Sequence, residues 1–189
     1  GGFTRSLQRD YDVGRSPGSL LAADVNGDGL TDLLCSDGSP ETLSLLSRPA
    51  GSGFARLPLT TPPGPRASQL AVADFDGDGK ADMLRVRPTG SIELWWQDGQ
   101  GAFSGKEVFR APAELSALVV ADLDLDQRPD VLALSAGRAS VYVLRNPARQ
   151  AGMRSPLQLV TTLTVGAAGS APVALVAADF DGDGLPDLA

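Results

Sequence analysis

Residues 72–84 read VADFDGDGKADML, and three other segments repeat this stretch without gaps. The matching segments are AADVNGDGLTDLL at 22–34, VADLDLDQRPDVL at 120–132 and AADFDGDGLPDLA at 177–189. Their first aspartates, starting from Asp24, are separated by 50, 48 and 57 residues. A recurring period of this length predicts a chain built from stacked copies of one structural unit.

Short apolar runs on both sides of each repeat predict strands. Gly, Pro and Asp residues bound these runs, and no 3.6-residue apolar period persists for ten residues, so no helix is predicted. A third strand is expected in each unit, at residues 42–46, 91–97 and 140–145. The strands that precede the repeats are apolar at nearly every position, which predicts burial on both faces. Four strands in roughly 50 residues are typical of a β-propeller blade.

The predicted fold is therefore all-β, with propeller blades of four antiparallel strands and about three and a half blades in the chain. A closed propeller has typically about 4–8 blades. We expect the chain to be part of a seven- or eight-bladed ring, or a half-ring that closes by self-association. The expected limits within one segment, residues 1–189, are a blade end at 1–14, blades at 15–64, 65–112 and 113–168, and a partial blade at 169–189.

Each repeat contains a nine-residue loop with oxygen-bearing side chains at positions 1, 3, 5 and 9. Ca²⁺ takes about six to eight oxygens, and a tight turn can bring these side chains and the carbonyl of position 7 to one point. Glycine at positions 4 and 6 of the first, second and fourth loops permits the positive φ of a sharp turn. We predict about three to four structural calcium ions. The predicted ligands are Asp24, Asn26, Asp28, Leu30, Asp32, Asp74, Asp76, Asp78, Lys80, Asp82, Asp122, Asp124, Asp126, Arg128, Asp130, Asp179, Asp181, Asp183, Leu185 and Asp187.

Metal sites of different kinds fit the residue types of these loops less well. An EF-hand needs a glutamate at position 12 and flanking helices, and Mg²⁺ demands near-octahedral geometry. The absence of histidine and the single cysteine disfavour zinc and copper. A metal-free turn remains the alternative, because Asp-Gly pairs are common in turns.

In the third loop Leu125 and Gln127 replace both glycines, so we expect weaker calcium binding there or an empty site.

Acidic residues are concentrated in the loops. The net charge is −7, yet fifteen of the 23 acidic residues lie in the four loops, and the rest of the chain is basic. We interpret this acidity as metal-ligand charge. No basic patch predicts a nucleic-acid partner. Arg85 and Arg87 are interpreted as members of surface ion pairs, with recognition of a carboxylate or phosphate as the alternative. No window approaches the roughly 20 apolar residues of a membrane span. The single Cys35 follows two leucines and is predicted to be a buried, small apolar residue.

The sequence resembles FG-GAP/VCBS-type repeats, the calcium-loop propeller blades that are also found in integrin α-subunits. The resemblance covers nearly the whole chain and rests on the ADFDGDGxxDL pattern, for example at residues 73–83 and 178–188. It implies that each loop joins the first two strands of a blade and is made rigid by Ca²⁺. It also implies an extracellular, periplasmic or cell-surface setting, in which calcium is near millimolar. Members of this family include adhesion receptors, lectins, toxin components and non-catalytic parts of enzymes.

The leading functional hypothesis is a calcium-stabilised interaction or adhesion module for protein or glycan partners, because propellers present loops on rigid sheets. One alternative is a lectin-like module in which Trp95 or Trp96 stacks on a sugar beside Glu93 or Gln97. Burial of both indoles between blades is the competing interpretation of these tryptophans. Another alternative is a non-catalytic part of a secreted enzyme or toxin. The chain lacks histidine and a nucleophile constellation, so no enzymatic activity is expected.

Overall fold

The computed structural model describes most of the chain, and all structural statements below concern the described residues. These are residues 10–13, 16–38, 41–47, 53–57, 69–87, 89–98, 102–148, 153–154, 156–166 and 170–189. The blade end expected at 1–14 lies mostly outside the described residues.

The described chain is all-β, and its strands form three four-stranded antiparallel sheets and one two-stranded sheet. Each four-stranded sheet runs in sequence order from its first to its fourth strand, as a propeller blade does. The only helical segment among the described residues is a three-residue 3₁₀ turn, η1 (Ala136–Arg138). The first sheet contains β1 (Pro17–Ala23), β2 (Asp32–Gly38), β3 (Glu41–Ser47) and β4 (Ala55–Leu57); the second contains β5 (Gln69–Ala73), β6 (Asp82–Val86), β7 (Ser91–Gln97) and β8 (Phe103–Arg110); the third contains β9 (Ala117–Ala121), β10 (Asp130–Ser135), β11 (Ser140–Arg145) and β12 (Gln158–Thr164); the fourth contains β13 (Ala177–Ala178) and β14 (Asp187–Leu188).

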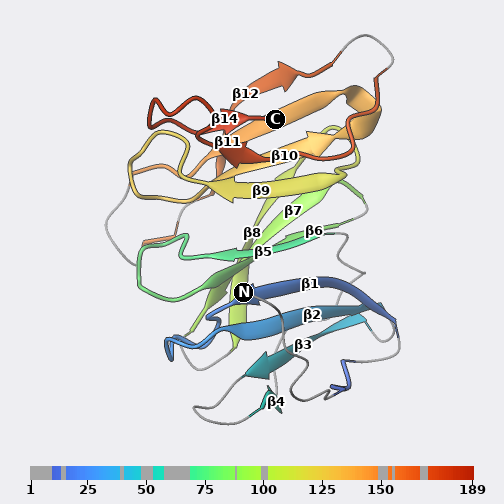
Figure 1. Ribbon diagram of the computed structural model, residues 1–189, viewed down its shortest axis with the longest axis vertical. Helices are drawn as coiled ribbons and strands as arrows, with labels where there is room; N and C mark the ends of the chain where they lie inside the picture. The colour runs from blue at the N-terminus through green and yellow to red at the C-terminus, as the bar shows by residue number, and fades with distance from the viewer. Residues whose placement is uncertain are drawn as a thin grey trace, which may run out of the picture.

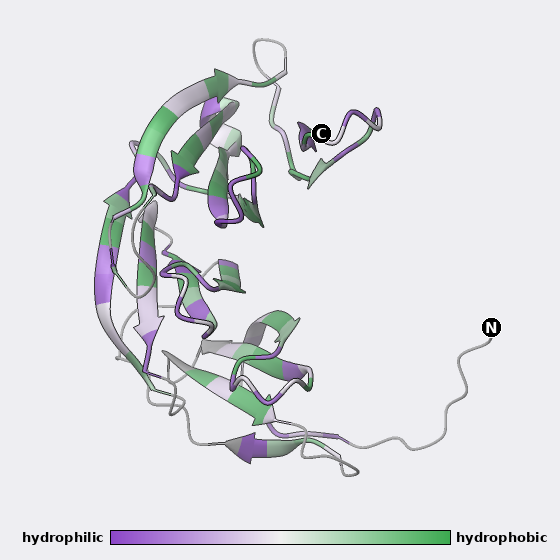
Figure 2. Cartoon of the chain, turned by 90° about the vertical axis from the view of Figure 1, so that its left-hand side faces the viewer, coloured by the Kyte–Doolittle hydropathy of each residue, from purple (hydrophilic) through white to green (hydrophobic). Residues whose placement is uncertain are grey.

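The four sheets lie side by side along an arc. Figure 1 shows the four-stranded sheets stacked from β1–β4 at the bottom to β9–β12 at the top, and Figure 2 shows the arc from the side, with the C-terminal pair β13–β14 at its end. The first strands of the three complete sheets are neighbours, because β5 contacts both β1 and β9. The described sheets do not close into a ring. The architecture therefore confirms the predicted blades and places their first strands on the inner side of the arc.

Apolar side chains fill the space between adjacent sheets. Between the first and second sheets, Leu34 and Leu45 pack with Met83 and Trp95. Between the second and third sheets, the neighbouring residues Leu84 and Trp96 lie in a separate cluster with residues of β10 and β11. Successive side chains of a strand point to opposite faces, so β6 and β7 supply both clusters. The second sheet is thereby held between its two neighbours.

Burial on both faces was predicted for the strands before the loops, and it is instead found in the strands after them. The strands β6 and β10 are buried at every position, whereas β5 and β9 are half-buried throughout. The reason is position in the blade: the second strand lies between hydrogen-bonded neighbours, and the first strand lies at the inner edge of the sheet. The expectation for Cys35 is confirmed, since its side chain is buried in β2.

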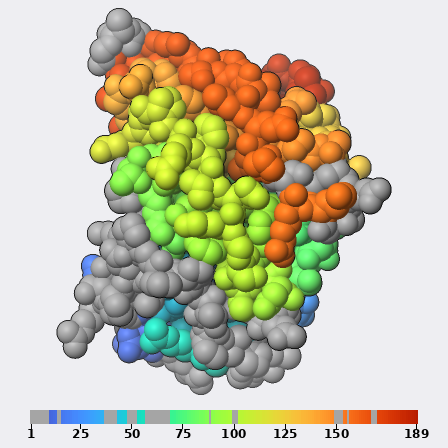
Figure 3. All heavy atoms as spheres, turned by 180° about the vertical axis from the view of Figure 1, so that it is seen from behind, coloured from blue at the N-terminus to red at the C-terminus, as the bar shows by residue number. Residues whose placement is uncertain are grey.

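The fourth strands form the outer surface of the arc. Figure 3 shows β8 and β12, coloured yellow-green and orange, on the face seen from behind. Every residue of β12 is exposed, and most of β8 is exposed or half-buried.

No helix in the described parts of the chain has the length and apolar character needed to cross a membrane.

Candidate metal centres

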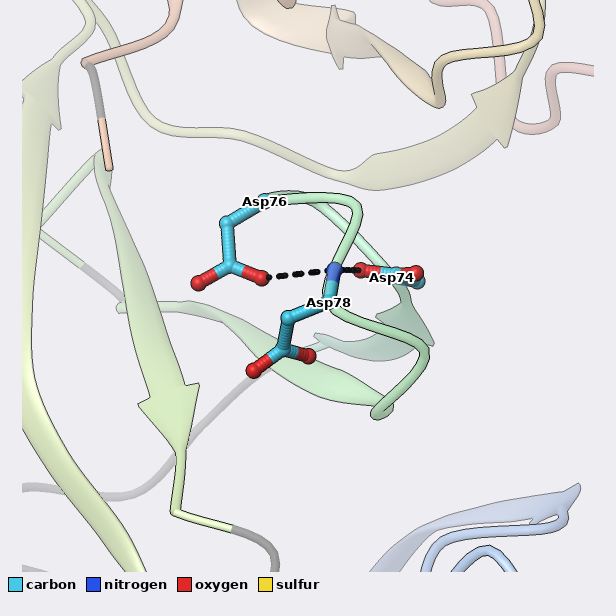
Figure 4. A group of neighbouring side chains, drawn as sticks. All are labelled: Asp74, Asp76 and Asp78. Atoms are coloured by element: carbon cyan, nitrogen blue, oxygen red, sulfur yellow. Dashed lines mark hydrogen bonds between the residues drawn. The ribbon is translucent and has the colours of Figure 1, made fainter. Parts of the chain in front are cut away.

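Each Asp-rich loop joins the first and second strands of its sheet, and aspartate side chains hold its turn in shape. In the second loop, Asp74 Oδ1 accepts the Gly77 and Asp78 N–H groups at 2.7 and 3.1 Å, and Asp74 Oδ2 accepts the Gly79 N–H at 2.8 Å. Asp76 Oδ1 also accepts the Asp78 N–H, at 3.2 Å. Figure 4 shows these three aspartates around one turn, with the Asp78 N–H between the other two carboxylates. The chain wraps around the acid at position 1.

The same hydrogen bonds recur in the other loops. Position 1 accepts the N–H of position 6 in the first, third and fourth loops, at 2.8, 2.7 and 3.0 Å. The acid at position 5 accepts the N–H of the position-7 residue in all four loops. These bonds hold in the turn the residues whose backbone carbonyls are predicted ligands. These residues are Leu30, Lys80, Arg128 and Leu185.

The turns bring carboxylates close together in three loops. One oxygen from each of three aspartates lies within 4.8 Å of the others in each cluster. The first loop has no such trio of carboxylates among its described residues, because Asn26 occupies position 3. The Asn26 amide donates to Asp28 Oδ2 at 3.1 Å instead. The clusters are Asp74, Asp76 and Asp78; Asp122, Asp124 and Asp130; and Asp179, Asp181 and Asp187.

The aspartate at position 9 anchors the second and third loops to their blades. Asp82 Oδ2 accepts the Phe75 N–H at 2.9 Å, and Asp82 Oδ1 accepts the Gln97 N–H at 3.0 Å. Asp130 makes the matching bonds to Leu123 and Asn146, at 3.2 and 2.8 Å. Each carboxylate oxygen has two lone pairs, so these bonds leave acceptor capacity for a cation.

Burial and neighbouring acids make the position-9 carboxylates costly to ionise without a counter-ion. Burial and the negative charges of Asp76 and Asp78 together raise the pKa of Asp82 to about 7. Its backbone hydrogen bonds lower this pKa but do not cancel the increase. Burial likewise raises the pKa of Asp130, with contributions from its loop neighbours Asp124 and Asp126. A divalent cation would reverse this balance by favouring the charged carboxylates.

The third loop adopts the same turn without its glycines. Leu125 and Gln127 have φ values of 60° and 66°, in the left-handed region that the glycines occupy in the other loops. The third loop therefore keeps the turn of the other loops and accepts a strained backbone at both positions. Its occupancy stays a prediction. Two arginines contact its acids: Arg128 bonds to Asp126, and Arg145 Nη1 lies 2.6 Å from Asp124 Oδ2.

The residues present fit a hard cation. The donor set consists of carboxylate and carbonyl oxygens, which Ca²⁺ prefers. In the third loop, Asp124 Oδ1 is buried and has no hydrogen-bond partner. The other oxygen of this carboxylate contacts Arg145. A buried, unpaired carboxylate oxygen is costly, and a cation bound in the cluster would satisfy it.

Sequence reasoning missed the contact of Arg145 with Asp124, because nothing in the sequence distinguishes this arginine from the others.

Both tryptophans lie between blades. The exposed fractions of Trp95 and Trp96 are 5% and 2%. Arg85 and Lys106 lie over the Trp95 ring, at 5.3 and 5.1 Å from its centroid, and Arg154 lies 5.4 Å from that of Trp96. Neither indole has an open face for a sugar, so the structure does not support the sugar-stacking interpretation. The two rings lie in the cores on opposite sides of the second sheet, because successive side chains of a strand point to opposite faces.

The ion pairs of Arg85 and Arg87 are buried, which corrects their interpretation as surface pairs. Both guanidiniums contact Glu93 Oε2, at 2.8 and 3.1 Å, and all three side chains are almost fully buried. Trp95 Nε1 donates to the same carboxylate at 3.2 Å, and Lys106 lies 3.3 Å from its other oxygen. The arrangement was not predictable from the sequence, since it depends on strand register placing Arg85 beside Glu93.

Comparisons with known proteins agree with this architecture. A family model described as an FG-GAP-like repeat matches residues 24–85, 74–133 and 122–189. No curated protein sequence matches the chain.

Two solved structures share the fold at low sequence identity. One is an Agrocybe aegerita lectin, described as recognising non-reducing terminal N-acetylglucosamine specifically; it is 22% identical over 92% of this chain, with a TM-score of 0.65. The other is the V. cholerae biofilm matrix protein Bap1, 20% identical over 86% of this chain, with a TM-score of 0.52. The chain spans 46% of the lectin and 22% of Bap1.

Proposed function

Since the chain belongs to the FG-GAP-like repeat family, we propose that it is a calcium-stabilised β-propeller interaction module that binds a protein or glycan partner. The observation that carries the calcium part is the recurrence of one oxygen-lined turn, which gathers three carboxylates within 4.8 Å in three of the four loops. The ions would be structural, because each loop connects two neighbouring strands of its sheet.

Calcium would act by neutralising the clustered acids. In the second loop Asp74, Asp76 and Asp78 surround one turn, and the buried Asp82 completes the set. Their mutual repulsion disfavours the folded loop, and a bound cation removes that cost. Since the folded loop would bind calcium and the unfolded chain would not hold it in place, binding would stabilise the fold.

Thermal unfolding of the full chain with Ca²⁺ and with chelator tests this proposal. We expect a higher melting temperature with Ca²⁺, because each site filled at 100 times its Kd adds about 2.7 kcal/mol to the free energy of unfolding. A chain carrying Asp76→Asn and Asp78→Asn should lose part of this gain, since Asn keeps an acceptor oxygen but removes the charge. Equal melting temperatures with Ca²⁺ and with chelator would contradict the proposal, and Mg²⁺ serves as the control ion.

A glycan is the partner class favoured by a specific observation, the structural likeness to a lectin. The buried tryptophans are unsuitable as a stacking platform. A cavity of about 410 Å³ between the second and third loops is a better candidate. Asp74, Asp76, Gln127 and Arg128 line it, and such acceptors and donors suit the hydroxyl groups of a sugar.

A glycan array followed by titration calorimetry tests the partner class. We expect Gln127→Ala to weaken binding of any hit at least about tenfold, which is the loss of about 1.4 kcal/mol expected for one or two hydrogen bonds. Gln158 on the exposed strand β12 provides the matched control, Gln158→Ala. If no glycan binds, or if both variants bind equally, the cavity is not a glycan site and a protein partner becomes the remaining candidate.

The setting we propose is extracellular, periplasmic or cell-surface, where calcium is abundant. The expected calcium affinity is then weak, with Kd of about 10⁻⁴–10⁻³ M as in extracellular modules. Calorimetric titration of the metal-free chain measures it, and a sub-micromolar Kd would argue against this setting. We propose no enzymatic activity for the segment.

A further inference from the structure

Gln97 and Asn146 occupy the same place in successive blades. Gln97 is the last residue of β7, and Asn146 directly follows β11. The backbone N–H of each donates to the position-9 aspartate of its own blade: Gln97 to Asp82 at 3.0 Å and Asn146 to Asp130 at 2.8 Å. Both side chains are almost fully buried, with exposed fractions of 2% and 1%. Each residue is therefore fixed to the loop of its own blade through its main chain.

The side-chain amides of the same two residues reach the loop of the preceding blade. Gln97 Nε2 donates to the carbonyl of Val25 in the first loop. Asn146 Nδ2 donates to the carbonyl of Phe75 in the second loop, at 3.0 Å. Val25 and Phe75 are both at position 2 of their loops, so the two contacts are equivalent. Gln97 Nε2 also bonds to the carbonyl of Ala81 in its own loop, at 3.0 Å.

The position-2 residues continue the connection into the preceding loop. The Val25 N–H donates to Asp32 at 3.2 Å, and the Phe75 N–H donates to Asp82 at 2.9 Å. Asp82 therefore bonds to Phe75 with one oxygen and to Gln97 with the other.

The result is an unbroken hydrogen-bonded series through three loops. It connects in order Asp32, Val25, Gln97, Asp82, Phe75, Asn146 and Asp130.

We propose that Gln97 and Asn146 are positioning residues that couple calcium binding in neighbouring loops; this inference rests on the proposed calcium function. A cation held by Asp82 would fix that carboxylate and, through it, the backbone of Gln97. The Gln97 amide would in turn hold the Val25 carbonyl, and with it the turn of the first loop. Both amides are buried, so water cannot easily replace the missing bond when a loop moves.

Coupling of this kind is reciprocal, and its usual size is a factor of about 5–150 in affinity. If the amides had only a structural role, removing one of them would also lower the stability of the fold. The calcium affinity of one loop would, however, not depend on whether the next loop holds calcium. The test therefore needs the affinity of each loop, resolved separately.

Hydrogen exchange measured by mass spectrometry during a Ca²⁺ titration of the full chain gives this resolution. The readout is the calcium concentration at which peptides from each loop become half-protected. Asp76→Asn with Asp78→Asn removes binding in the second loop. We expect this knockout to raise the midpoint of the first loop at least about fivefold.

The decisive comparison repeats this knockout in a chain that carries Gln97→Met. Methionine keeps the length of the side chain and removes its donor, while the backbone bond to Asp82 persists. In that background we expect the second-loop knockout to leave the first-loop midpoint unchanged. Gln158→Met is the matched control, because it makes the same change on the exposed strand β12 and should preserve the fivefold effect.

Several outcomes would overturn the inference. It is wrong if the knockout leaves the first-loop midpoint unchanged in the otherwise natural chain, or if Gln97→Met preserves the full effect. Protection of every loop by Ca²⁺ at independent midpoints would refute the coupling alone. Absence of any protection by Ca²⁺ would refute both the coupling and the proposed calcium function.

A second knockout makes the test independent of how well Gln97→Met folds. Asp124→Asn with Asp126→Asn removes binding in the third loop, which Asn146 connects to the second loop. We expect the midpoint of the second loop to shift more than that of the first loop. Where Ca²⁺ protects the third loop of the unmodified chain, equal shifts of the two midpoints, or none, would contradict the series of contacts.

Discussion

Leu125 in the third loop occupies the same left-handed φ region as Gly77 in the second, with φ values of 60° and 72°. A residue with a Cβ pays roughly 1–2 kcal/mol for this left-handed conformation, whereas glycine does not. Glycine costs about 0.5–1 kcal/mol more to order on folding. The balance favours glycine, and Leu125 is exposed, so little apolar burial would be lost by replacing it.

We therefore predict that Leu125→Gly raises the free energy of unfolding by about 0.5–1 kcal/mol, and that adding Gln127→Gly gives a similar further gain. Urea denaturation in chelator measures this effect apart from metal binding. Leu185→Gly is the matched control: Leu185 is also an exposed loop leucine, but it has no positive φ. This control should be destabilised. An unchanged or lower stability of Leu125→Gly would contradict the strain argument.

Gly90 is predicted to be essential for the turn between β6 and β7. Its φ is +83°, and a Cβ added there would lie 2.2 Å from the Ala113 carbonyl oxygen. That atom belongs to the backbone and cannot move cheaply, so Gly90→Ala should lower the free energy of unfolding by about 2–4 kcal/mol. Gly137→Ala is the control, because nothing lies within 4 Å of its added Cβ and its φ is ordinary. Equal melting temperatures of the two variants would show that the turn relaxes.

The buried carboxylate of Glu93 predicts a pH dependence of stability. Burial alone would raise the pKa of Glu93, but the hydrogen bond from Arg85 and the charges of Arg85 and Arg87 outweigh it and lower this pKa from 4.5 to about 2. A folded-state pKa below the unfolded value stabilises the fold above about pH 4.5. That contribution is lost as the pH falls from 4.5 toward 2.

Glu93→Gln should therefore lower the free energy of unfolding by about 3 kcal/mol at pH 7, because it removes the charge that both guanidiniums contact. The difference from the unmodified chain should be clearly smaller at pH 3. Urea denaturation at the two pH values measures it, with exposed Glu114→Gln as the control. A difference that is the same at pH 7 and pH 3 would argue against the lowered pKa.

The chain contains only two tryptophans, so its fluorescence reports directly on the second blade. Because Trp95 and Trp96 are both buried, we predict weak quenching by acrylamide in the folded chain and strong quenching in urea. Addition of N-acetylglucosamine should not shift the emission, since neither ring can contact a sugar. A saccharide-dependent shift would restore the tryptophans as candidate ligand-binding residues.

The sequence alone was sufficient to predict the repeat, the all-β blades and the residues of the four loops. The reason is locality: a loop such as residues 74–82 contains its own acids, its own left-handed positions and its own flanking strands. The third strands were also predicted well, because β7 and β11 match the expected residues. Strand burial was predicted less well, since it depends on where each strand lies in its sheet.

The contacts between blades were decided only by the tertiary structure. Burial of Trp95 and Trp96, the pairing of Arg85 with Glu93 and the amide contacts of Gln97 and Asn146 all join residues whose proximity depends on strand register or on which sheet faces which. Val25 and Gln97 are 72 residues apart, so no local pattern could connect them. The amino-acid sequence determined what each blade contains, and the packing of one blade on the next determined which of those groups meet.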